Sequence, residues 1–583
     1  MAHELGQHWF GDYVQGRDWA NIWLNEGFAT YLEALYTQYH EGNDAYRYAI
    51  YNDQMTEQAQ QHQDYLRPIV DRHYSDPLQM FDTITHEKGA AVLDMLRYVV
   101  DGPKAASHPA AQNEALLRAL RNYLSAHRAQ TADTDDLADS IRQSTGTELG
   151  WFFHEWVYMA GHPDYRVAAS YDEAKKTETI SITQTQHADD MTPVFVMPID
   201  IEFHGAQGEI KRVQVHDDLP QQEFSVPLDF KPLWVDFDPD DFIDKTLEFS
   251  KPTAALIAEA EQDRSMMARL SAVQQLGMKS RRDSIADAQG RIDALKRVLA
   301  SDEFYGMRAA AAASLAEIGG EQAKGPLIVA LKQTDSRVRI AVVKALGNFI
   351  KDEAVYDAVV SALRDDESYA VEAAAAEEIG RSQKAEAFQI LQANAVGQPD
   401  VHVMEGLLAG ISATKDRRAA AILFAKAQPG VPEPIRLSAL AGLRALKGVV
   451  EQEHSQDLAW TVQAALEDPF LPVRLAGEQL AGEFHLVQFE ADIRKDLNAP
   501  LIMQRELAQK VLRQLQVLKA RDCFPSAETS QRDDWPVLES KSVNRSRDPS
   551  TAARVPGESA PASSSHRVDA NNSCVHPAQS HRI

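Results

Sequence analysis

The chain has 583 residues, which is enough for several domains that each bury a hydrophobic core of their own. Apolar residues make up 44% and charged residues 25%, as is typical of globular proteins. The formal net charge of -27 disfavours nucleic acid and anionic membranes as partners, because both would repel the chain. No run of about 18 apolar residues occurs, so no membrane span is predicted.

The two cysteines, Cys523 and Cys574, lie in a polar C-terminal segment. The folded part is therefore predicted to contain no disulfide, no cysteine nucleophile and no thiolate zinc site. Residues 521–583 are rich in Ser, Pro, Arg, Asp and Asn and have almost no aliphatic side chains. Such a composition cannot bury enough apolar surface to order itself, so this tail is predicted to be disordered.

Residues 1–165 have the pattern of a helical domain. Long amphipathic stretches cover 20–39 and 88–100. The aromatic run at 151–156 is suited to a buried helix, and Gly-His-Pro at 161–163 should end it, since glycine followed by proline commonly stops a helix.

From 166 to 250 the apolar residues alternate with polar ones, which is the period of a strand with one buried face. The alternation is clearest at 179–183, 199–203 and 213–215, and turn residues separate these runs. This region is predicted to be a small antiparallel β-sandwich.

Between 255 and 520 one pattern recurs about every 31 to 39 residues. An arginine is followed seven residues later by an apolar residue, with alanines between them, at Arg269, Arg308, Arg339 and Arg436. The recurrence and the small alanine faces resemble HEAT-type helical hairpins, so an α-solenoid is predicted. An ordinary helical bundle is the alternative. The predicted fold class is therefore multidomain and mainly α.

The strongest chemical signal is His3-Glu4-x-x-Gln7-His8 at the start of the chain, with Glu26 further on. A zinc peptidase needs two imidazoles on one helix face, a carboxylate that activates the metal-bound water, and a third ligand. His3 and Glu4 suit the first ligand and the general base. Glu26 suits the third ligand.

These residues, with several further segments, resemble the aminopeptidase N family of gluzincin zinc metallopeptidases. The family pattern is His-Glu-x-x-His, followed after eighteen residues by Glu. The resemblance implies Zn²⁺ as cofactor, peptides as substrates, and part of a thermolysin-like helical catalytic domain over residues 1–165. The sandwich and the repeats resemble the family's later domains. The matching segments are 9–12 (Trp-Phe-Gly-Asp), 24–29 (Leu-Asn-Glu-Gly-Phe-Ala), 81–84 (Phe-Asp-Thr-Ile), 88–90 (Lys-Gly-Ala), 151–153 (Trp-Phe-Phe) and 161–163 (Gly-His-Pro).

The second metal ligand departs from the family. Its place, four residues after His3, is taken by Gln7, a poor zinc ligand beside imidazole. On a regular helix His8 points roughly 140° away from His3, because five residues advance by about 500°. A π-bulge would bring His8 to the metal, an arrangement that the dipeptidyl peptidase III family resembles. The alternative is that tight metal binding has been lost.

A second departure is His86, which stands where the family carries a catalytic tyrosine that hydrogen-bonds the tetrahedral oxyanion. A histidine could donate the same hydrogen bond if protonated or in the right tautomer. The alternative is a surface histidine in a non-catalytic relative. The family's amine-binding Gly-x-Met-Glu-Asn loop, which precedes the metal helix, is not in this sequence, so an N-terminally truncated catalytic domain is expected.

The resulting hypothesis is a zinc-dependent aminopeptidase that hydrolyses N-terminal peptide bonds through a zinc-bound water, with Glu4 as general base. His3, Glu26 and His8 would hold the metal, and His86 would steady the oxyanion. Two alternatives stay open: an inactive pseudo-peptidase that binds a protein partner through its repeats, and an incomplete gene product whose full form is the enzyme.

Overall fold

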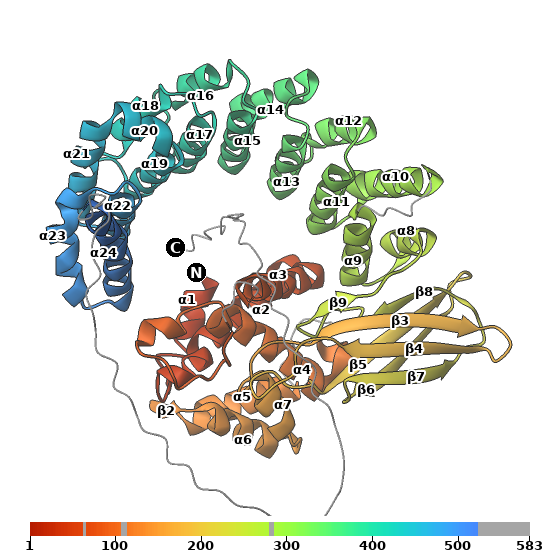
Figure 1. The fold of residues 1–583 in the computed structure, drawn as a ribbon. Coiled ribbons are helices and arrows are strands. Elements are labelled where there is room, and N and C mark those ends of the chain that lie inside the picture. The colour runs from red at the N-terminus through yellow and green to blue at the C-terminus, as the bar shows by residue number, and fades with distance from the viewer. Residues whose placement is uncertain (62–65, 107–113, 279–284, 523–583) are drawn as a thin grey trace, which may run out of the picture. The chain divides into compact units, whose positions relative to one another are not determined.

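The computed structural model describes residues 1–61, 66–106, 114–278 and 285–522. Met1–Cys523 form one compact unit, in which a helical part, two small sheets and a long series of helices follow one another (Figure 1). The predicted fold class is confirmed in these parts. The predicted disordered tail, apart from residues 521 and 522, and both cysteines lie outside the described residues.

The helical part that carries the sequence motif consists of seven α-helices and one short two-stranded sheet among its described residues. Strand β1 pairs with β2 in parallel. The elements are α1 (Ala2–Gln7), β1 (Val14–Gly16), α2 (Trp23–Glu41), α3 (Asn43–Gln61), η3 (Ile84–Lys88, one turn of π-helix), α4 (Gly89–Ala106), α5 (Ala115–Ala126), β2 (Gln130–Ala132), α6 (Thr134–Thr145) and α7 (Gly150–Trp156).

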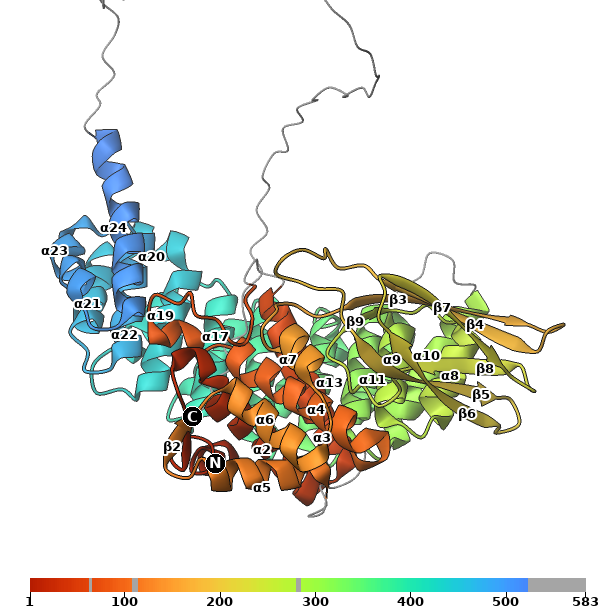
Figure 2. The ribbon, with the colours of Figure 1, turned by 90° about the horizontal axis from the view of Figure 1, so that it is seen from below.

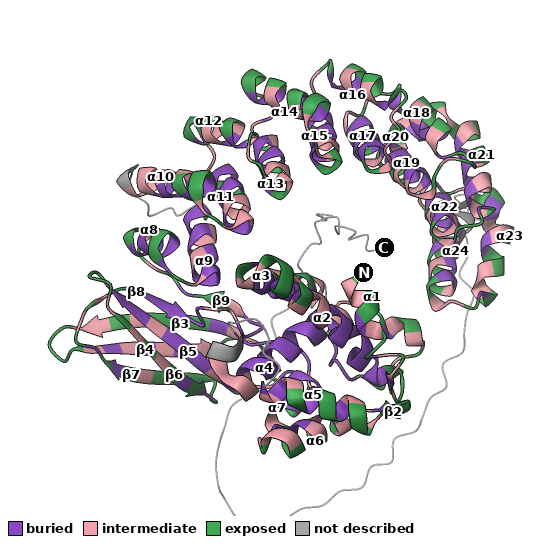
Figure 3. Ribbon diagram, turned by 180° about the vertical axis from the view of Figure 1, so that it is seen from behind, coloured by how far each residue is buried: buried purple, intermediate pink, exposed green. Residues whose placement is uncertain are grey.

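Helix α2 runs through the core of this part, and most of its N-terminal half is buried (Figure 3). Its Phe28 ring stacks on Phe10 with the ring centroids 4.0 Å apart. The buried Trp23 donates a hydrogen bond from Nε1 to Thr134 Oγ1 over 2.9 Å. Aromatic packing of this kind fixes the rotation of α2 about its axis, and thereby which residues face the motif of α1.

The start of α4 approaches α2 closely at two glycines. A Cβ placed on Gly27 would lie 3.1 Å from the Cα of Gly89, and one on Gly89 would lie 3.0 Å from the Cα of Gly27. Any larger side chain would push the two backbones apart. This pair therefore brings η3, which ends next to Gly89, against the first turn of α2.

The two following sheets form layers that lie one over the other (Figure 2). Apolar side chains from both inner faces share one core, including Ile180 and Ile182 from one sheet and Ile199, Ile201 and Phe203 from the other. The predicted alternation at 179–183 and 199–203 thus marks buried faces. The strands are β3 (Asp164–Asp172), β4 (Thr177–Gln184), β5 (Met197–Gly205), β6 (Ile210–Asp217), β7 (Gln221–Pro227), β8 (Pro232–Phe237) and β9 (Thr246–Glu248).

The strand orders are β7-β4-β3-β9 and β6-β5-β8. Every pair in these two sheets is antiparallel, as predicted, except β3 with the short strand β9, which is parallel. Strand β9 reaches β3 by a long return of the chain rather than by a hairpin, and only a hairpin imposes the antiparallel direction.

From residue 253 onwards the described chain is helical. Helices α9, α11, α13, α15, α17, α19, α22 and α24 lie side by side in succession, with the other helices against them (Figure 1). The bounds are α8 (Thr253–Gln262), α9 (Met266–Gly277), α10 (Ile285–Ser301), α11 (Tyr305–Ile318), α12 (Glu321–Ala330), α13 (Ser336–Gly347), α14 (Glu353–Asp365), α15 (Tyr369–Arg381), α16 (Ala387–Ala395), α17 (Val401–Ala413), α18 (Ala419–Lys426), α19 (Glu433–Ala445), α20 (Lys447–Glu453), α21 (Ser455–Leu466), α22 (Leu471–Glu483), α23 (Glu490–Ile493) and α24 (Ile502–Asp522).

The recurring arginine has a local role that explains the sequence pattern. Arg308 donates from Nη1 to the backbone oxygens of Asp302 and Glu303, at 2.6 and 3.0 Å. Arg339 makes the same two bonds five and six residues back, at 3.0 and 2.8 Å. Each arginine therefore satisfies carbonyls of the turn before its own helix, which would otherwise lack partners. Arg474 and Arg505 repeat the geometry.

Among the residues that the structure describes, no helix combines the length and the apolar content needed to cross a bilayer. The domain boundaries near 165 and 255 stay a prediction.

Gly410→Ala should destabilise the helical series by about 2–3 kcal/mol, because the added Cβ overlaps the backbone oxygen of Ala376 in the neighbouring helix α15. Urea denaturation followed by circular dichroism measures the change. Gly448→Ala is the matched control: this glycine lies in α20 with no atom from beyond its chain neighbours near its missing Cβ, so the variant should be neutral or more stable by up to about 1 kcal/mol. Equal effects of the two substitutions would contradict this close approach of α15 and α17.

Helix α7 meets the sheets through Glu155, whose Oε2 accepts a hydrogen bond from the backbone N–H of Val196 at 2.8 Å. Burial raises the pKa of Glu155 from 4.5 to about 7. Because the folded-state pKa is raised, the free energy of unfolding should fall as the pH rises from 4.5 to about 7 and then stay level.

Glu155→Gln should remove this part of the pH dependence and stabilise the protein at pH 8 by on the order of 1–2 kcal/mol, because no charge is then buried. Denaturation midpoints at pH 5 and pH 8 test it. The exposed Glu148, changed to Gln, serves as the control and should leave both midpoints in place. A wild-type protein that gains stability between pH 5 and 7 relative to Glu155→Gln would refute the assignment.

Candidate metal centre

Three side chains from three separate elements converge at the N-terminal end of α2. They are His3 from α1, Glu26 from α2 and His86 from η3. The Nε2 atom of His3 lies 3.2 Å from Glu26 Oε2, and the Nε2 atom of His86 lies 3.3 Å from the same oxygen. The two imidazole rings are stacked with centroids 6.0 Å apart. One potential ligand atom of each residue lies within 4.8 Å of the other two.

Helix α2 contacts both ring nitrogens of His3: Glu26 faces Nε2, and Thr30 and Glu33 face Nδ1. The second ring nitrogen, Nδ1, lies 3.4 Å from Thr30 Oγ1 and 4.0 Å from Glu33 Oε2. Glu26, Thr30 and Glu33 share one face of α2, since they are four and three residues apart. Thr30 and Glu33 therefore hold the ring with its Nε2 toward Glu26, as outer partners do for metal-binding histidines.

The π-turn η3 orients His86 in the same way. Its Nδ1 lies 2.8 Å from the backbone oxygen of Asp82, which can only accept, so Nδ1 carries the proton. The loop before His86 is tied down by Arg67, which forms a two-bond ion pair with the Asp82 carboxylate at 2.6 and 3.0 Å and donates to Thr85 Oγ1 at 2.8 Å. The remaining nitrogen, Nε2, is thereby directed at Glu26.

Electrostatics keep the Glu26 carboxylate ionised. Burial alone would raise its pKa, but hydrogen bonds with His3, His86 and Gln7 outweigh burial and lower the pKa from 4.5 to about 2. For His86, burial acts to lower the pKa, and the Glu26 carboxylate with the Asp82 carbonyl outweighs it and raises the pKa above the usual value. A full negative charge thus faces the two imidazoles at neutral pH.

Gln7 takes up the face of α1 where the resemblance implies a second ligand. Its Nε2 donates to Glu26 Oε2 at 2.7 Å and lies 3.4 Å from His3 Nε2. The amide is therefore part of the cluster as a hydrogen-bond donor. It holds Glu26 toward His3 and helps to keep that carboxylate charged.

His8 is not brought to the cluster. Its side chain is 65% exposed, and its Nδ1 lies 2.8 Å from Asp12 Oδ2. The π-bulge considered for this helix is absent: α1 ends at Gln7, and the N–H of His8 bonds to the oxygen of Leu5, which tightens the last turn instead of widening it. Glu4 is exposed on α1 beside His3, and its role as general base stays a prediction.

The part of His86 in this cluster was missed at the sequence level, where it was assigned only to the oxyanion. The signal that could have found it is an exchange of residue types. One imidazole is missing at residue 7 relative to the family pattern, and one is gained at residue 86. Two histidines and one glutamate remain, which is a donor set that zinc favours.

The chain is similar to known aminopeptidases. Residues 1–156 match the peptidase family M1 domain, and residues 292–377 match HEAT repeats. Probable aminopeptidase 1 of Sulfurisphaera tokodaii is 29% identical over 183 residues, which is 30% of this chain and 21% of that protein. Aminopeptidase N of Lactobacillus delbrueckii subsp. lactis is 30% identical over 171 residues, covering 28% of this chain and 18% of that protein. The match spans about a fifth of the length of these curated relatives.

The crystal structure of Legionella pneumophila aminopeptidase A in complex with aspartic acid has a similar fold, with a TM-score of 0.60. The similarity covers 88% of this chain and 65% of that one. At 16% sequence identity it concerns the fold alone. The matched segments confirm the predicted resemblance: residues 1–156 are similar to the domain of peptidase family M1, as in aminopeptidase N, and residues 292–377 to HEAT repeats.

Proposed function

We propose that this chain forms the metal centre of a zinc-dependent aminopeptidase, with His3, Glu26 and His86 as the protein ligands. The observation that carries the proposal is the convergence of two imidazole nitrogens on one ionised carboxylate oxygen, at 3.2 and 3.3 Å. Two imidazoles and one carboxylate are a donor set of catalytic zinc sites, which keep a fourth place open. Peptidases of family M1 are zinc-dependent, and hydrolysis of N-terminal peptide bonds is the activity that the relatives' names suggest.

When bound, zinc would supply Lewis-acid polarisation of the scissile carbonyl and lower the pKa of water. The chain's own contribution to proton transfer is assigned to Glu4, which follows His3 on α1 and is exposed. Its carboxylate takes the proton of the attacking water and delivers it to the leaving amine. His86 serves as a ligand in this scheme and not as an oxyanion donor, because its free nitrogen faces Glu26.

One observation favours the alternative of an inactive, protein-binding relative. Gln7 already donates to the Glu26 oxygen that faces both imidazoles, and a metal would have to compete with this 2.7 Å hydrogen bond. The HEAT repeats would then carry the function by binding a partner protein, since helical solenoids present extended surfaces for partners. The two variants below separate this alternative from the enzyme.

His86→Ala should weaken zinc binding by about 100-fold or more, because it removes a ligand. His8→Ala, next to the helix that carries His3, is the matched control and should leave the affinity unchanged, because His8 faces Asp12. Competition with a chromogenic chelator measures both affinities. If His8→Ala lost zinc and His86→Ala kept it, His8 would be the ligand in place of His86, and the proposed ligand set would be rejected.

Glu4→Gln should lower the rate of hydrolysis of aminoacyl p-nitroanilides by about 10²–10⁴-fold while zinc stays bound, because only proton transfer is removed. A panel of different aminoacyl groups is used. A wild-type chain that binds zinc at the His86-dependent site and hydrolyses none of the panel would favour the binding scaffold. Activity that is equal in wild type and Glu4→Gln would remove Glu4 from the catalytic role.

A further inference from the structure

A second cluster of metal-ligating side chains lies about 200 residues further along the chain, on the outer face of the sheet β6-β5-β8. On β5 the side chains of residues 199, 201 and 203 enter the core, so Glu202 and His204 face outward on the opposite side of the sheet. Asp236 lies directly across from Glu202 on the neighbouring strand β8. Asp263 ends helix α8, which packs on β8.

The imidazole of His204 points into a group of three carboxylate oxygens. Its Nε2 lies 3.1 Å from Asp236 Oδ2, 3.2 Å from Glu202 Oε2 and 3.3 Å from Asp263 Oδ2. None of these oxygens has hydrogen-bond geometry to Nε2, which is buried without a hydrogen-bond partner on a residue only 4% exposed. A buried polar atom of this kind is costly unless something else satisfies it.

Each carboxylate has its other oxygen held by a group outside the cluster. Arg212 donates to Glu202 Oε1 at 2.8 Å, and Lys251 donates to Asp236 Oδ1 at 3.0 Å. The Oδ1 atom of Asp263 accepts the backbone N–H of Ser265 at 2.7 Å. The outer partners thus leave one oxygen per carboxylate turned toward His204, which is how ligating carboxylates are oriented around metal ions.

The indole of Trp234 fixes the arrangement from one side. Its ring stacks on His204 with centroids 4.5 Å apart and an interplanar angle of 8°. Its single N–H is shared between Asp236 Oδ2 and Asp263 Oδ2, at 3.1 and 3.0 Å. Two buried carboxylate oxygens that share one donor repel each other, and a cation between them and His204 would remove the repulsion.

We propose that His204, Asp236 and Asp263 bind a second zinc ion, separate from the His3 centre, with Glu202 beside it. The two nitrogen–oxygen distances of 3.1 and 3.3 Å are close to the edge of a tetrahedron whose metal–ligand bonds are about 2.0–2.1 Å long. One imidazole with carboxylates suits zinc better than calcium or magnesium, which prefer oxygen alone. All three ligands are buried, so the ion would tie together the elements that carry them.

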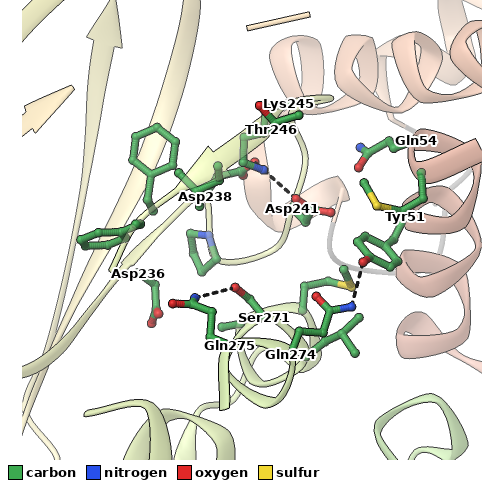
Figure 4. A pocket seen from close by; sticks show the side chains of 18 of the residues that line it. Tyr51, Gln54, Asp236, Asp238, Asp241, Lys245, Thr246, Ser271, Gln274 and Gln275 are labelled. Carbon is green, nitrogen blue, oxygen red and sulfur yellow. Dashed lines mark hydrogen bonds and ion pairs between the residues drawn. The ribbon is translucent and has the colours of Figure 1, made fainter. Parts of the chain in front are cut away.

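A cavity of about 550 Å³ lies next to this site, and Asp236 is the one residue of the cluster that lines it. It lies between α3, the loop after β8 and helix α9, and Asp236, Lys251 and Glu259 are among the residues that line it (Figure 4). The bound ion would join the sheet to the end of α8, since two ligands come from β5 and β8 and the third from the turn before α9.

The test uses the full chain carrying His3→Ala and His86→Ala, so that the first centre cannot contribute. This double variant should still bind one zinc per chain in a chelator competition, and zinc should raise its melting temperature. Adding His204→Gln, or the nearly isosteric Asp263→Asn, should weaken binding by about 100-fold or more and abolish the zinc-dependent shift. His162→Gln, at another buried histidine, is the matched control and should keep both.

Should the added variants fail to fold, the double variant itself decides the matter. A zinc-edge anomalous difference map of its crystals should place the ion between His204 and Asp263. The proposal is overturned if the double variant binds no zinc at micromolar concentration, if the map places the ion elsewhere, or if His204→Gln and His162→Gln bind zinc equally. In those cases the cluster is a buried ion-pair network in which His204 is the cation.

Discussion

The close approach of Gly27 and Gly89 is the constraint on which the candidate metal centre depends. Each glycine is next to, or one helical turn from, a residue of the cluster: Glu26 precedes Gly27, and His86 lies three residues before Gly89. A Cβ on either glycine would lie 3.0–3.1 Å from the facing backbone, so that backbone would have to move by a few tenths of an ångström. The two glycines therefore set how closely the carboxylate of α2 and the imidazole of η3 approach each other.

In both clusters, partners outside the cluster determine which atom of a side chain faces inward. The Asp82 carbonyl, with Asp82 held by Arg67, orients His86. Arg212 and Lys251 orient the carboxylates of Glu202 and Asp236. Buried charges are retained when such partners compensate their desolvation. In the helical series, Arg308, Arg339, Arg474 and Arg505 likewise each satisfy two carbonyls of the preceding turn.

Much of the site could be predicted from the sequence, because local spacing determines local geometry. His3 and Glu26 were both expected, and they lie together. The 3.6-residue period puts Gln7 on the face of His3 and turns His8 away, as in the structure, so the π-bulge predicted to bring His8 to the metal does not form. The position of His86 could not be derived in this way. It depends on a π-turn at 84–88, far along the chain from His3 and Glu26, and on contacts of Arg67. Neither feature leaves a periodic pattern in the sequence.

The sequence by itself determined the fold class, the recurring helical unit and the residues of α1 and α2 that face one another, since these follow from periods of 3.6, two and thirty-odd residues. Only the tertiary structure decided which histidine joins His3 and Glu26, and that His204 meets Asp236 and Asp263. Both choices pair elements that are distant in the chain, and such pairings are set by core packing and by the exclusion of side chains at Gly27 and Gly89.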